Sequence, residues 1–494
     1  MMAGISPDLP RNPPVGAVFG ACLEPCVEPF GPISARRSLG YADKRASARA
    51  ERAGAGGRKC GMSRNWLSFF FLFAFATLMC TSASGQNNFK VIHSFQGPPN
   101  DASYVVSRLV FDQQGNLYGT SANGGTSANG TVFKLSPNGD GSWSESLLYS
   151  FCSVYNGQLC FDGASSDAGL VMDSAGNLYG TTVSGGSHDG CGQPRGCGTV
   201  FELSPPASQG GTWTEAVLYN FCSVFSGTDC LDGYVPQAPL VFDAAGNLYG
   251  TTSSGGSGHF PFGASGGTVF ELSPAMEGWK QAVLYNFCSV GQGETCPDGN
   301  APYLAGVTFD PTGNLYGTTE NGGSTKTEGG GVIYELSPNS GRWTEKVLAA
   351  FPSSAKSYGV PSGGVVLDPS GNLYGTFEAP KGGVFRLSSR NGKGRVFIFN
   401  GADGDEPIGG VTLDLKHGIL YGTTSGGGNV NAGNVYAIAA DGTETVLHNF
   451  CSQPNCVDGQ LPWSTLVQDK SGNLYGTTEF GGEYGAGIVF EITP

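Results

Sequence analysis

The sequence predicts an all-β fold, a seven-bladed β-propeller with four-stranded blades. Three observations lead to this prediction. The hexapeptide GNLYGT recurs along the chain, apolar phrases recur with it, and 81 of the 494 residues are Gly, which favours short strands and turns over long helices. The hexapeptide begins at Gly115, Gly176, Gly246, Gly313, Gly371 and Gly472, and a relative, GILYGT, begins at Gly418. The repeat unit is therefore about 60 residues long, the length of a propeller blade with its loops.

The first 85 residues do not fit the repeat. Residues 1–61 are rich in Pro, Gly, Ala and Arg without an apolar period, so we expect a disordered or mis-assigned N-terminal extension. Residues 62–85 have the order of a secretory signal peptide, with Arg64, an apolar run over residues 66–79 and then small residues. We therefore predict an exported protein that is extracellular, at the cell surface or periplasmic. The alternative is an uncleaved signal segment, which would be the chain's one contact with a membrane.

Each unit opens with an apolar run that ends in Asp, and this run is the predicted first strand. A D-x-x-G-N turn follows, in which Asp can cap the turn and Gly can take a positive φ. These Asp residues are Asp112, Asp173, Asp243, Asp310, Asp368, Asp414 and Asp469. The NLYGT of the hexapeptide is the second strand, and because both faces of a blade are covered, its Tyr should pack between blades rather than line a ligand site. The tyrosines are Tyr118, Tyr179, Tyr249, Tyr316, Tyr374, Tyr421 and Tyr475.

Two further phrases complete the unit. GTVFELSP at residues 198–205 is typical of the third strand, and EAVLYNF at residues 215–221 of the fourth. Six copies of the fourth phrase follow a third strand, whereas the seventh, KVIHSF at residues 90–95, stands alone at the start. A propeller closes in this way, with its N-terminal strand completing the last blade and leaving no open sheet edge. We predict the propeller over residues 86–494.

The charge balance limits the partners. The first 85 residues hold 10 of the 26 basic and 5 of the 40 acidic residues, which leaves 16 basic and 35 acidic residues, a formal charge of −19, for residues 86–494. Nucleic acids and anionic membranes need a basic surface. The expected partner is therefore a protein or a glycan, and no nucleic acid.

Ten cysteines recur in pairs. Four pairs follow the fourth strand and are present or absent together from one unit to the next, as bonded partners would be in an oxidising compartment. The predicted disulfides join Cys152 to Cys160, Cys222 to Cys230, Cys288 to Cys296, Cys451 to Cys456 and, in another loop, Cys191 to Cys197. A metal site is less compatible with the pairs, because they belong to separate blades.

A second set of aspartates occupies equivalent places between the fourth strand and the next first strand. Its members are Asp101, Asp162, Asp232, Asp298, Asp403 and Asp458, with Ser357 in the seventh place. Five are followed by Gly, which is turn chemistry. The alternative is a ring of carboxylates at one mouth of the channel that binds Ca²⁺, the one cofactor the sequence suggests.

Long, varied loops should gather on one face of the propeller, because the connections from second to third strand and from fourth to first strand emerge there. We take this face as the candidate binding surface. On the fourth strands, Trp143, Trp213, Trp279 and Trp343 are expected to pack on the outer hairpins, with sugar stacking as the alternative. No catalytic triad, phosphate loop or dinucleotide fingerprint is recognisable.

The phrases D-x-x-GNLYGTT, GG and GTVFELSP together resemble the Gloeo/Verruco (GloVer) tandem repeat of exported bacterial proteins, often described as choice-of-anchor proteins. The resemblance covers essentially the whole of residues 86–494. It implies export and surface display, and it brings no established activity or catalytic residues.

Two functions fit the sequence. The first is an exported or surface propeller that acts as a binding or structural module without catalysis. The alternative is a propeller enzyme of the lyase or lactonase type, which uses carboxylates at the channel mouth, with or without Ca²⁺. We expect the first, because an active site usually breaks the symmetry of a repeat and no unit carries an evident catalytic insertion.

Overall fold

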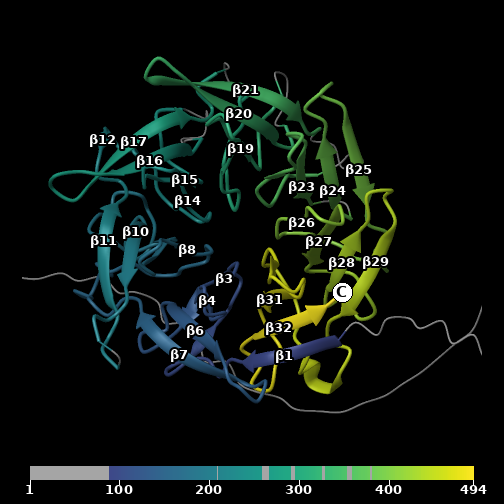
Figure 1. Ribbon diagram of the computed structural model, residues 1–494. Helices are drawn as coiled ribbons and strands as arrows, with labels where there is room; N and C mark the ends of the chain where they lie inside the picture. Colours follow the sequence, from purple (N-terminus) through teal and green to yellow (C-terminus); the bar gives the residue numbers. More distant parts are fainter. Residues whose placement is uncertain are drawn as a thin grey trace, which may run out of the picture. The chain divides into compact units, whose positions relative to one another are not determined.

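The computed structural model describes residues 88–208, 210–258, 266–290, 295–324, 329–352, 359–378 and 381–494. The predicted N-terminal extension, the predicted signal peptide and Ser357 lie outside the described residues. The described residues form seven four-stranded antiparallel sheets that follow one another around a central channel (Figure 1). The predicted seven-bladed propeller is confirmed.

Each blade contributes one strand to each of four rings. The innermost strands are β3 (Val110–Phe111), β8 (Val171–Met172), β14 (Val241–Phe242), β18 (Thr308–Phe309), β22 (Val366–Leu367), β26 (Thr412–Asp414) and β30 (Val467–Gln468). The second strands are β4 (Leu117–Ser121), β9 (Leu178–Thr182), β15 (Leu248–Thr252), β19 (Leu315–Thr318), β23 (Leu373–Phe377), β27 (Ile419–Thr424) and β31 (Leu474–Thr478).

The third strands are β6 (Thr131–Pro137), β10 (Thr199–Ser204), β16 (Thr268–Pro274), β20 (Val332–Asn339), β24 (Gly383–Leu387), β28 (Asn434–Ile438) and β32 (Ile488–Thr493). The outermost strands are β7 (Trp143–Ser150), β11 (Thr214–Asn220), β17 (Trp279–Asn286), β21 (Arg342–Ala350), β25 (Gly394–Ile398), β29 (Glu444–Asn449) and β1 (Asn88–Ser94). Outside the blades lie β2 (Ala102–Ser103), β5 (Asn123–Gly124), β12 (Phe225–Ser226), β13 (Asp229–Cys230) and the short 3-10 helix η1 (Pro454–Cys456).

The ring closes in the seventh blade. Strand β1, the first of the described chain, pairs antiparallel with β32, the last, from Asn88 opposite Thr493 to Ser94 opposite Ile488. The predicted closure by the N-terminal strand is therefore confirmed. Thr477 Oγ1 of the seventh blade also donates a hydrogen bond to the carbonyl oxygen of Ser107, 3.4 Å away, before the first blade.

The D-x-x-G-N-x-Y phrase forms one hydrogen-bonded turn between the two inner strands. In the third blade, Asp243 Oδ1 accepts from the backbone N–H groups of Ala245 and Asn247, and its Oδ2 accepts from Asn247 Nδ2 at 2.8 Å and Tyr249 OH at 3.2 Å. Gly246 sits in the turn at a φ of +86°. These aspartates therefore cap turns, as expected. The sixth blade differs, since Asp414 is bonded to His417 Nδ1 at 2.7 Å instead.

The rest of the hexapeptide joins sheets and blades. A Cβ added to Gly250 would lie 2.7 Å from both Phe270 of the next strand and Leu240, so only glycine leaves room for these side chains. Thr251 Oγ1 donates to the carbonyl oxygen of Ala305, 3.1 Å away in the following blade. Equivalent bonds between blades are donated by Thr120, Thr318, Thr376, Thr423 and Thr477.

The hydrophobic core is divided into layers between blades. Between the third and fourth blades, for example, Tyr249, Val269 and Phe287 pack with Leu315 and Tyr334. The tyrosines of the second strands are buried or half-buried in such layers, as predicted. The four tryptophans of the outer hairpins are half-buried against them, with Trp213 next to Tyr118 and Trp279 next to Tyr179.

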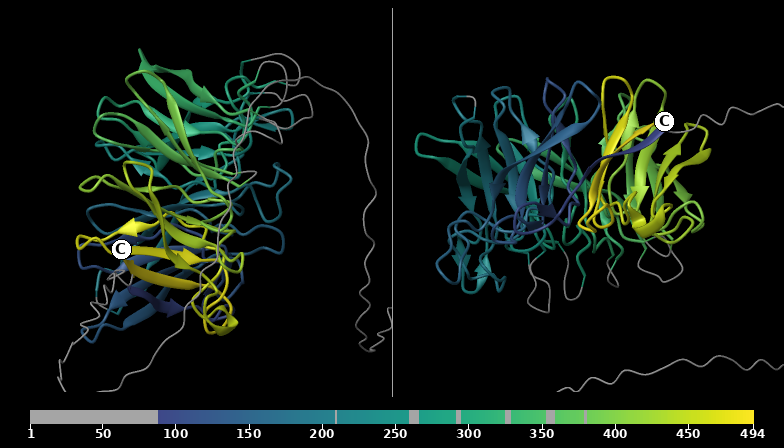
Figure 2. Two further views of the ribbon diagram at one scale, coloured as in Figure 1. Left: turned by 90° about the vertical axis from the view of Figure 1, so that its right-hand side faces the viewer. Right: turned by 90° about the horizontal axis from the view of Figure 1, so that it is seen from below.

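The two faces of the propeller differ. Hairpin turns between first and second strands and between third and fourth strands lie on one face, and the longer loops lie on the other (Figure 2). We call the second face the loop face. Among the described residues, no helix is both long enough and apolar enough to span a membrane.

Candidate functional site

Seven crossing loops carry the chain from the outermost strand of one blade to the innermost strand of the next, across the loop face. Their described residues are 95–109, 151–170, 221–240, 287–290 with 295–307, 351–352 with 359–365, 399–411 and 450–466. Each begins at the outside of the propeller and ends at the channel. The crossing loops therefore contain the predicted aspartates, most of the paired cysteines and part of the channel lining.

The predicted aspartates of the crossing loops accept hydrogen bonds from residues at the start of their own loops. Asp162 Oδ2 accepts from Tyr149 OH at 2.8 Å and from the backbone N–H and hydroxyl of Ser153 at 2.8 and 2.7 Å, and Oδ1 accepts from the Val154 N–H at 3.1 Å. Asp232 and Asp298 repeat this arrangement on the same residue types. Each carboxylate thus ties the start of its loop to the end of the outermost strand.

The other three aspartates are variants of the same cap. Asp458 accepts from Ser452 and lies 3.2 Å from His448 Nε2, and Asp403 accepts from the Asn400 N–H at 2.6 Å. Asp101 accepts from the backbone N–H groups of Gln96 and Ala102. Burial acts to raise the pKa of its carboxyl, but His93, 3.9 Å away, and these backbone bonds hold that pKa below the ordinary value.

The aspartate ring does not converge on the channel. None of its six members lines the channel cavity, and each accepts hydrogen bonds at its own crossing loop. Within the described ranges, no group of three or more His, Cys, Asp or Glu side chains is arranged to hold a metal ion. Binding of Ca²⁺ stays a hypothesis for experiment.

Five disulfides are present between the cysteines that the sequence pairs: Cys152 and Cys160, Cys191 and Cys197, Cys222 and Cys230, Cys288 and Cys296, and Cys451 and Cys456. Four of them clamp the start of a crossing loop. The first cysteine of each of these four has a positive φ of 54–62°.

A cavity of about 590 Å³ occupies the channel, a volume in the range of small-molecule sites. Its wall consists of the innermost strands and the ends of the crossing loops. Two positions repeat around it: a rim position four residues before each innermost strand, and a waist position two residues before it. The rim position lies nearer the loop face, because the chain enters the innermost strand from there.

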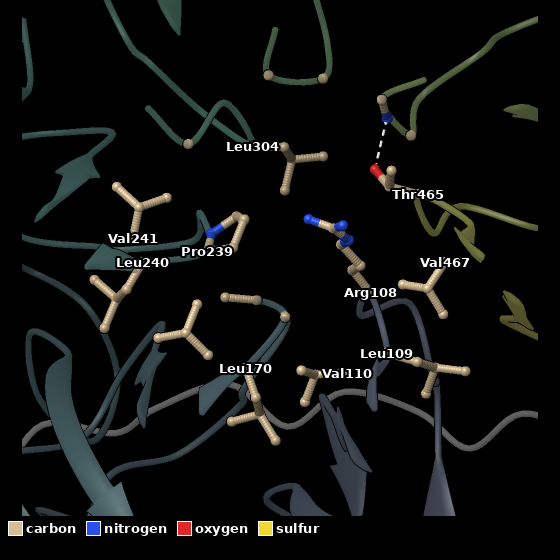
Figure 3. A pocket seen from close by; sticks show the side chains of 18 of the residues that line it. Arg108, Leu109, Val110, Leu170, Pro239, Leu240, Val241, Leu304, Thr465 and Val467 are labelled. Atoms are coloured by element: carbon tan, nitrogen blue, oxygen red, sulfur yellow. Dashed lines mark hydrogen bonds between the residues drawn. The ribbon is translucent and has the colours of Figure 1, made fainter. Parts of the chain in front are cut away.

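The rim position carries a different residue in every blade. In blade order the rim residues are Val106, Asp167, Gln237, Leu304, Ser362, Ile408 and Trp463. All except Ser362 line the cavity. The waist residues, all of which line the cavity, are Arg108, Gly169, Pro239, Gly306, Gly364, Gly410 and Thr465. Figure 3 shows Arg108 extending into the cavity between Thr465 and Pro239.

Three rim residues have buried polar atoms without a hydrogen-bond partner in the described structure: Asp167 Oδ1, Gln237 Oε1 and Trp463 Nε1. Burial raises the pKa of Asp167 to about 6, and a hydrogen bond from Gln237 acts in the opposite direction. Unpaired polar atoms in a buried place are costly and call for an explanation, such as a ligand that pairs with them. The rim is therefore equipped for polar recognition.

Further acids lie on the loop face, just after the second strands. Glu479 and Glu378 follow β31 and β23, and Glu320 comes two residues after β19. Burial, and then the charges of Glu320 and Glu406, raise the pKa of Glu378 to about 7. Burial, and then Glu479 and Asp167, raise the pKa of the Tyr104 phenol to about 12. Burial thus favours the protonated form of both of these side chains.

The crossing loops hold an unusual backbone conformation shortly before the rim. Six residues there that are not glycine have a φ of 53–59°: Tyr104, Ser165, Val235, Ala301, Glu406 and Leu461. Such a φ is uncommon for residues with a side chain and strained for a β-branched one such as Val235. At Ser165, Val235, Ala301 and Leu461, backbone hydrogen bonds fix this conformation on both sides. The Val235 N–H, for example, donates to the Cys197 carbonyl oxygen, and the Ser253 N–H donates to the Val235 carbonyl oxygen.

The rim and waist residues were not among the predicted site residues. The sequence contains a signal for them, because the crossing loops repeat their aspartate but differ at the rim position. That signal becomes visible only when the loops are aligned from the innermost strand backwards, and its meaning depends on knowing that this position faces the channel.

The chain belongs to the Gloeobacter/Verrucomicrobia repeat family, whose model matches residues 76–260, 192–380 and 361–494. The resemblance of the repeated phrases is thereby confirmed. No curated protein matches the chain.

Solved structures resemble the chain at low similarity. A protein of Bacteroides uniformis, provisionally assigned as a 6-phosphogluconolactonase, is 15% identical over 69% of this chain and 83% of its own, with a TM-score of 0.40. PorZ, a surface component of the type-IX secretion system of Porphyromonas gingivalis, is 15% identical over 80% of this chain and 46% of its own, with a TM-score of 0.44. These similarities carry no argument about function.

Proposed function

We propose that this protein is an exported or cell-surface binding module that holds a protein or glycan ligand at the channel mouth on the loop face, without catalysis. One observation carries the proposal. The positions that build the blades repeat from unit to unit, whereas the rim position, which faces the channel, is different in all seven blades. A scaffold with a symmetrical frame and an asymmetrical pocket suits the recognition of one particular ligand.

Export is supported by the five disulfides, which persist in oxidising compartments, and by the signal peptide predicted at residues 62–85. The acidic balance of residues 86–494 supports a partner other than nucleic acid.

An enzyme of the lyase or lactonase type is the second candidate, and Asp167 is the observation that favours it. Its pKa, raised to about 6, would suit a general acid or base, and it lines the channel. Against it, the capping aspartates are bound to their own loops and are not available for chemistry. Exchanging Asp167 for Asn separates the two: an enzyme would lose turnover, whereas a binding module would keep a measurable affinity.

The test is thermal unfolding of the full chain, with its disulfides intact, against panels of glycans, peptides and Ca²⁺. A ligand that binds only the folded state raises the midpoint. Leu304→Trp places a bulky side chain in the channel cavity and should weaken or abolish the shift. Met276→Trp adds the same side chain at a fully exposed turn on the opposite face and should leave the shift unchanged. A shift that is undiminished in Leu304→Trp would place the ligand elsewhere.

A further inference from the structure

Arg108 breaks the symmetry of the channel waist. The waist positions of four other blades are glycines, and added side chains would collide there: a Cβ on Gly169 would lie 2.9 Å from Arg108 Cβ, and one on Gly306 would lie 2.9 Å from the Pro239 carbonyl oxygen. The backbones of neighbouring blades thus approach one another closely around the waist. Into this narrow ring Arg108 alone sends a long, charged side chain (Figure 3).

The guanidinium of Arg108 has no partner in the part of the chain that the structure describes. It makes no hydrogen bond or ion pair there, and the residue is exposed in the channel cavity that it lines. The other charged residue that lines the cavity, Asp167, is not among the groups that act on it. A guanidinium that faces an open cavity without a counter-charge is available to bind an anion.

The neighbouring rim residues indicate what else the ligand carries. Trp463, Asp167 and Gln237 come from the blades beside and after that of Arg108, so the four residues occupy one continuous part of the ring. The Trp463 indole N–H is an unused donor, and Asp167 Oδ1 and Gln237 Oε1 are unused acceptors. Gln237 is only 8% exposed. Hydroxyl groups, which both donate and accept, would satisfy all three. The other part of the rim includes the apolar Leu304 and Ile408.

We propose that the channel binds a small polyhydroxylated carboxylic acid, such as a uronic acid unit of a glycan, with its carboxylate on Arg108 and its hydroxyls on Asp167, Gln237 and Trp463. This inference rests on the proposed binding function. The planar guanidinium can hold a carboxylate through two parallel hydrogen bonds. Inorganic phosphate also pairs with a guanidinium, but it lacks the ring hydroxyls that would pair with Asp167, Gln237 and Trp463.

The experiment is calorimetric titration of the full chain with D-glucuronate and D-galacturonate, and with D-glucose, D-galactose and inorganic phosphate for comparison. We expect a uronate to bind, and the neutral sugars and phosphate to bind at least about tenfold more weakly. Arg108→Gln should weaken uronate binding by about ten- to a hundredfold. Arg108→Lys, which keeps the charge but loses the two parallel hydrogen bonds of the guanidinium, should weaken uronate binding less. Arg395→Gln removes the same charge from an exposed site on β25 and should have no effect.

Several results would overturn the inference. They are uronate binding that Arg108→Gln leaves intact, equal binding of the neutral sugars, and absence of uronate binding to the wild-type chain. If neutral sugars or peptides bind and Leu304→Trp blocks them while Arg108→Gln does not, the proposed binding function stands and the carboxylate inference fails. Circular dichroism establishes that each variant is folded, and should Arg108→Gln not fold, Arg108→Lys and the comparison of ligands still decide.

Discussion

Four outermost strands each carry a glutamate beside the capping aspartate of the preceding crossing loop. They are Glu145, Glu215, Glu345 and Glu444, and the Oε1 atom of each is buried without a hydrogen-bond partner in the described structure. Burial, and then the charge of Asp162, raise the pKa of Glu215 to about 8. The third blade has Gln281 at this position, and its Nε2 donates to the carbonyl oxygen of Asp232 at 3.2 Å.

This arrangement predicts a pH-dependent stability. Between the ordinary pKa of 4.5 and the folded value of about 8, the folded state keeps a proton on Glu215 that the unfolded state has released. The free energy of unfolding therefore falls as the pH rises through this window. We expect Glu215→Gln, which introduces the residue that the third blade has as Gln281, to stabilise the protein by on the order of 1–2 kcal/mol at pH 8 and to have little effect at pH 4.5.

Chemical denaturation at the two pH values measures this difference. Glu277→Gln, in an exposed turn, is the control and should be neutral at both. Equal effects of Glu215→Gln at pH 4.5 and pH 8 would show that the glutamate is ionised in the folded protein and contradict the prediction.

Within single blades, two glycines of the hexapeptide have different reasons to be glycine. Gly250 faces Phe270 and Leu240 at 2.7 Å, whereas Gly246 has open space around its Cβ position but a φ of +86°. We expect Gly250→Ala to destabilise the protein by about 1–3 kcal/mol through overpacking, and Gly246→Asn to cost less, because Asn tolerates a positive φ. Denaturant unfolding of both variants checks the order, and a larger loss for Gly246→Asn would contradict it.

One crossing loop keeps its aspartate cap without a disulfide. The loop of residues 399–411 has no cysteine, yet Asp403 still caps it through Asn400. Replacing Cys222 and Cys230 together by Ala should therefore leave the fold intact and lower the free energy of unfolding by about 2–3 kcal/mol on the chain-entropy model. Thermal unfolding with circular dichroism tests both parts, and complete unfolding of the double variant at room temperature would show that the disulfide is required for folding.

The whole propeller depends on the pairing of β1 with β32. Deleting residues 88–95 would expose the edge of β32 and the core layer around Phe95, so we expect aggregation or loss of cooperative unfolding. A circular permutant that joins Pro494 to Asn88 by a short linker and opens the exposed turn at Gly139 should fold, since closure then moves to the first blade. Size-exclusion chromatography and calorimetry compare the two, and a monomeric, cooperatively folded deletion variant would refute the dependence.

Most of the architecture could be predicted from the sequence, because each blade residue has one role that is repeated seven times. The Asp and Tyr of D-x-x-G-N-x-Y recur since they bond to one another, and the fourth-strand phrase at residues 90–95 recurs since it closes the ring. The disulfides could be predicted because their cysteine pairs also recur from blade to blade. The channel site could not, because Arg108 and Trp463 each occur once at their positions and repetition reveals only what is shared. The unpaired state of Arg108 depends on contacts between blades, which no local phrase contains.

The hydrogen bonds that hold Val235 and its counterparts at a positive φ have an evolutionary consequence. Because the backbones of four crossing loops are fixed on both sides just before the rim, at Ser165, Val235, Ala301 and Leu461, the rim side chain there can be exchanged without altering the blade behind it. Folding and ligand choice are thus encoded at separate positions of the same repeat. Single substitutions among these rim side chains would therefore change the ligand during evolution. Related proteins with the same residues four places before their innermost strands should accordingly bind the same ligand.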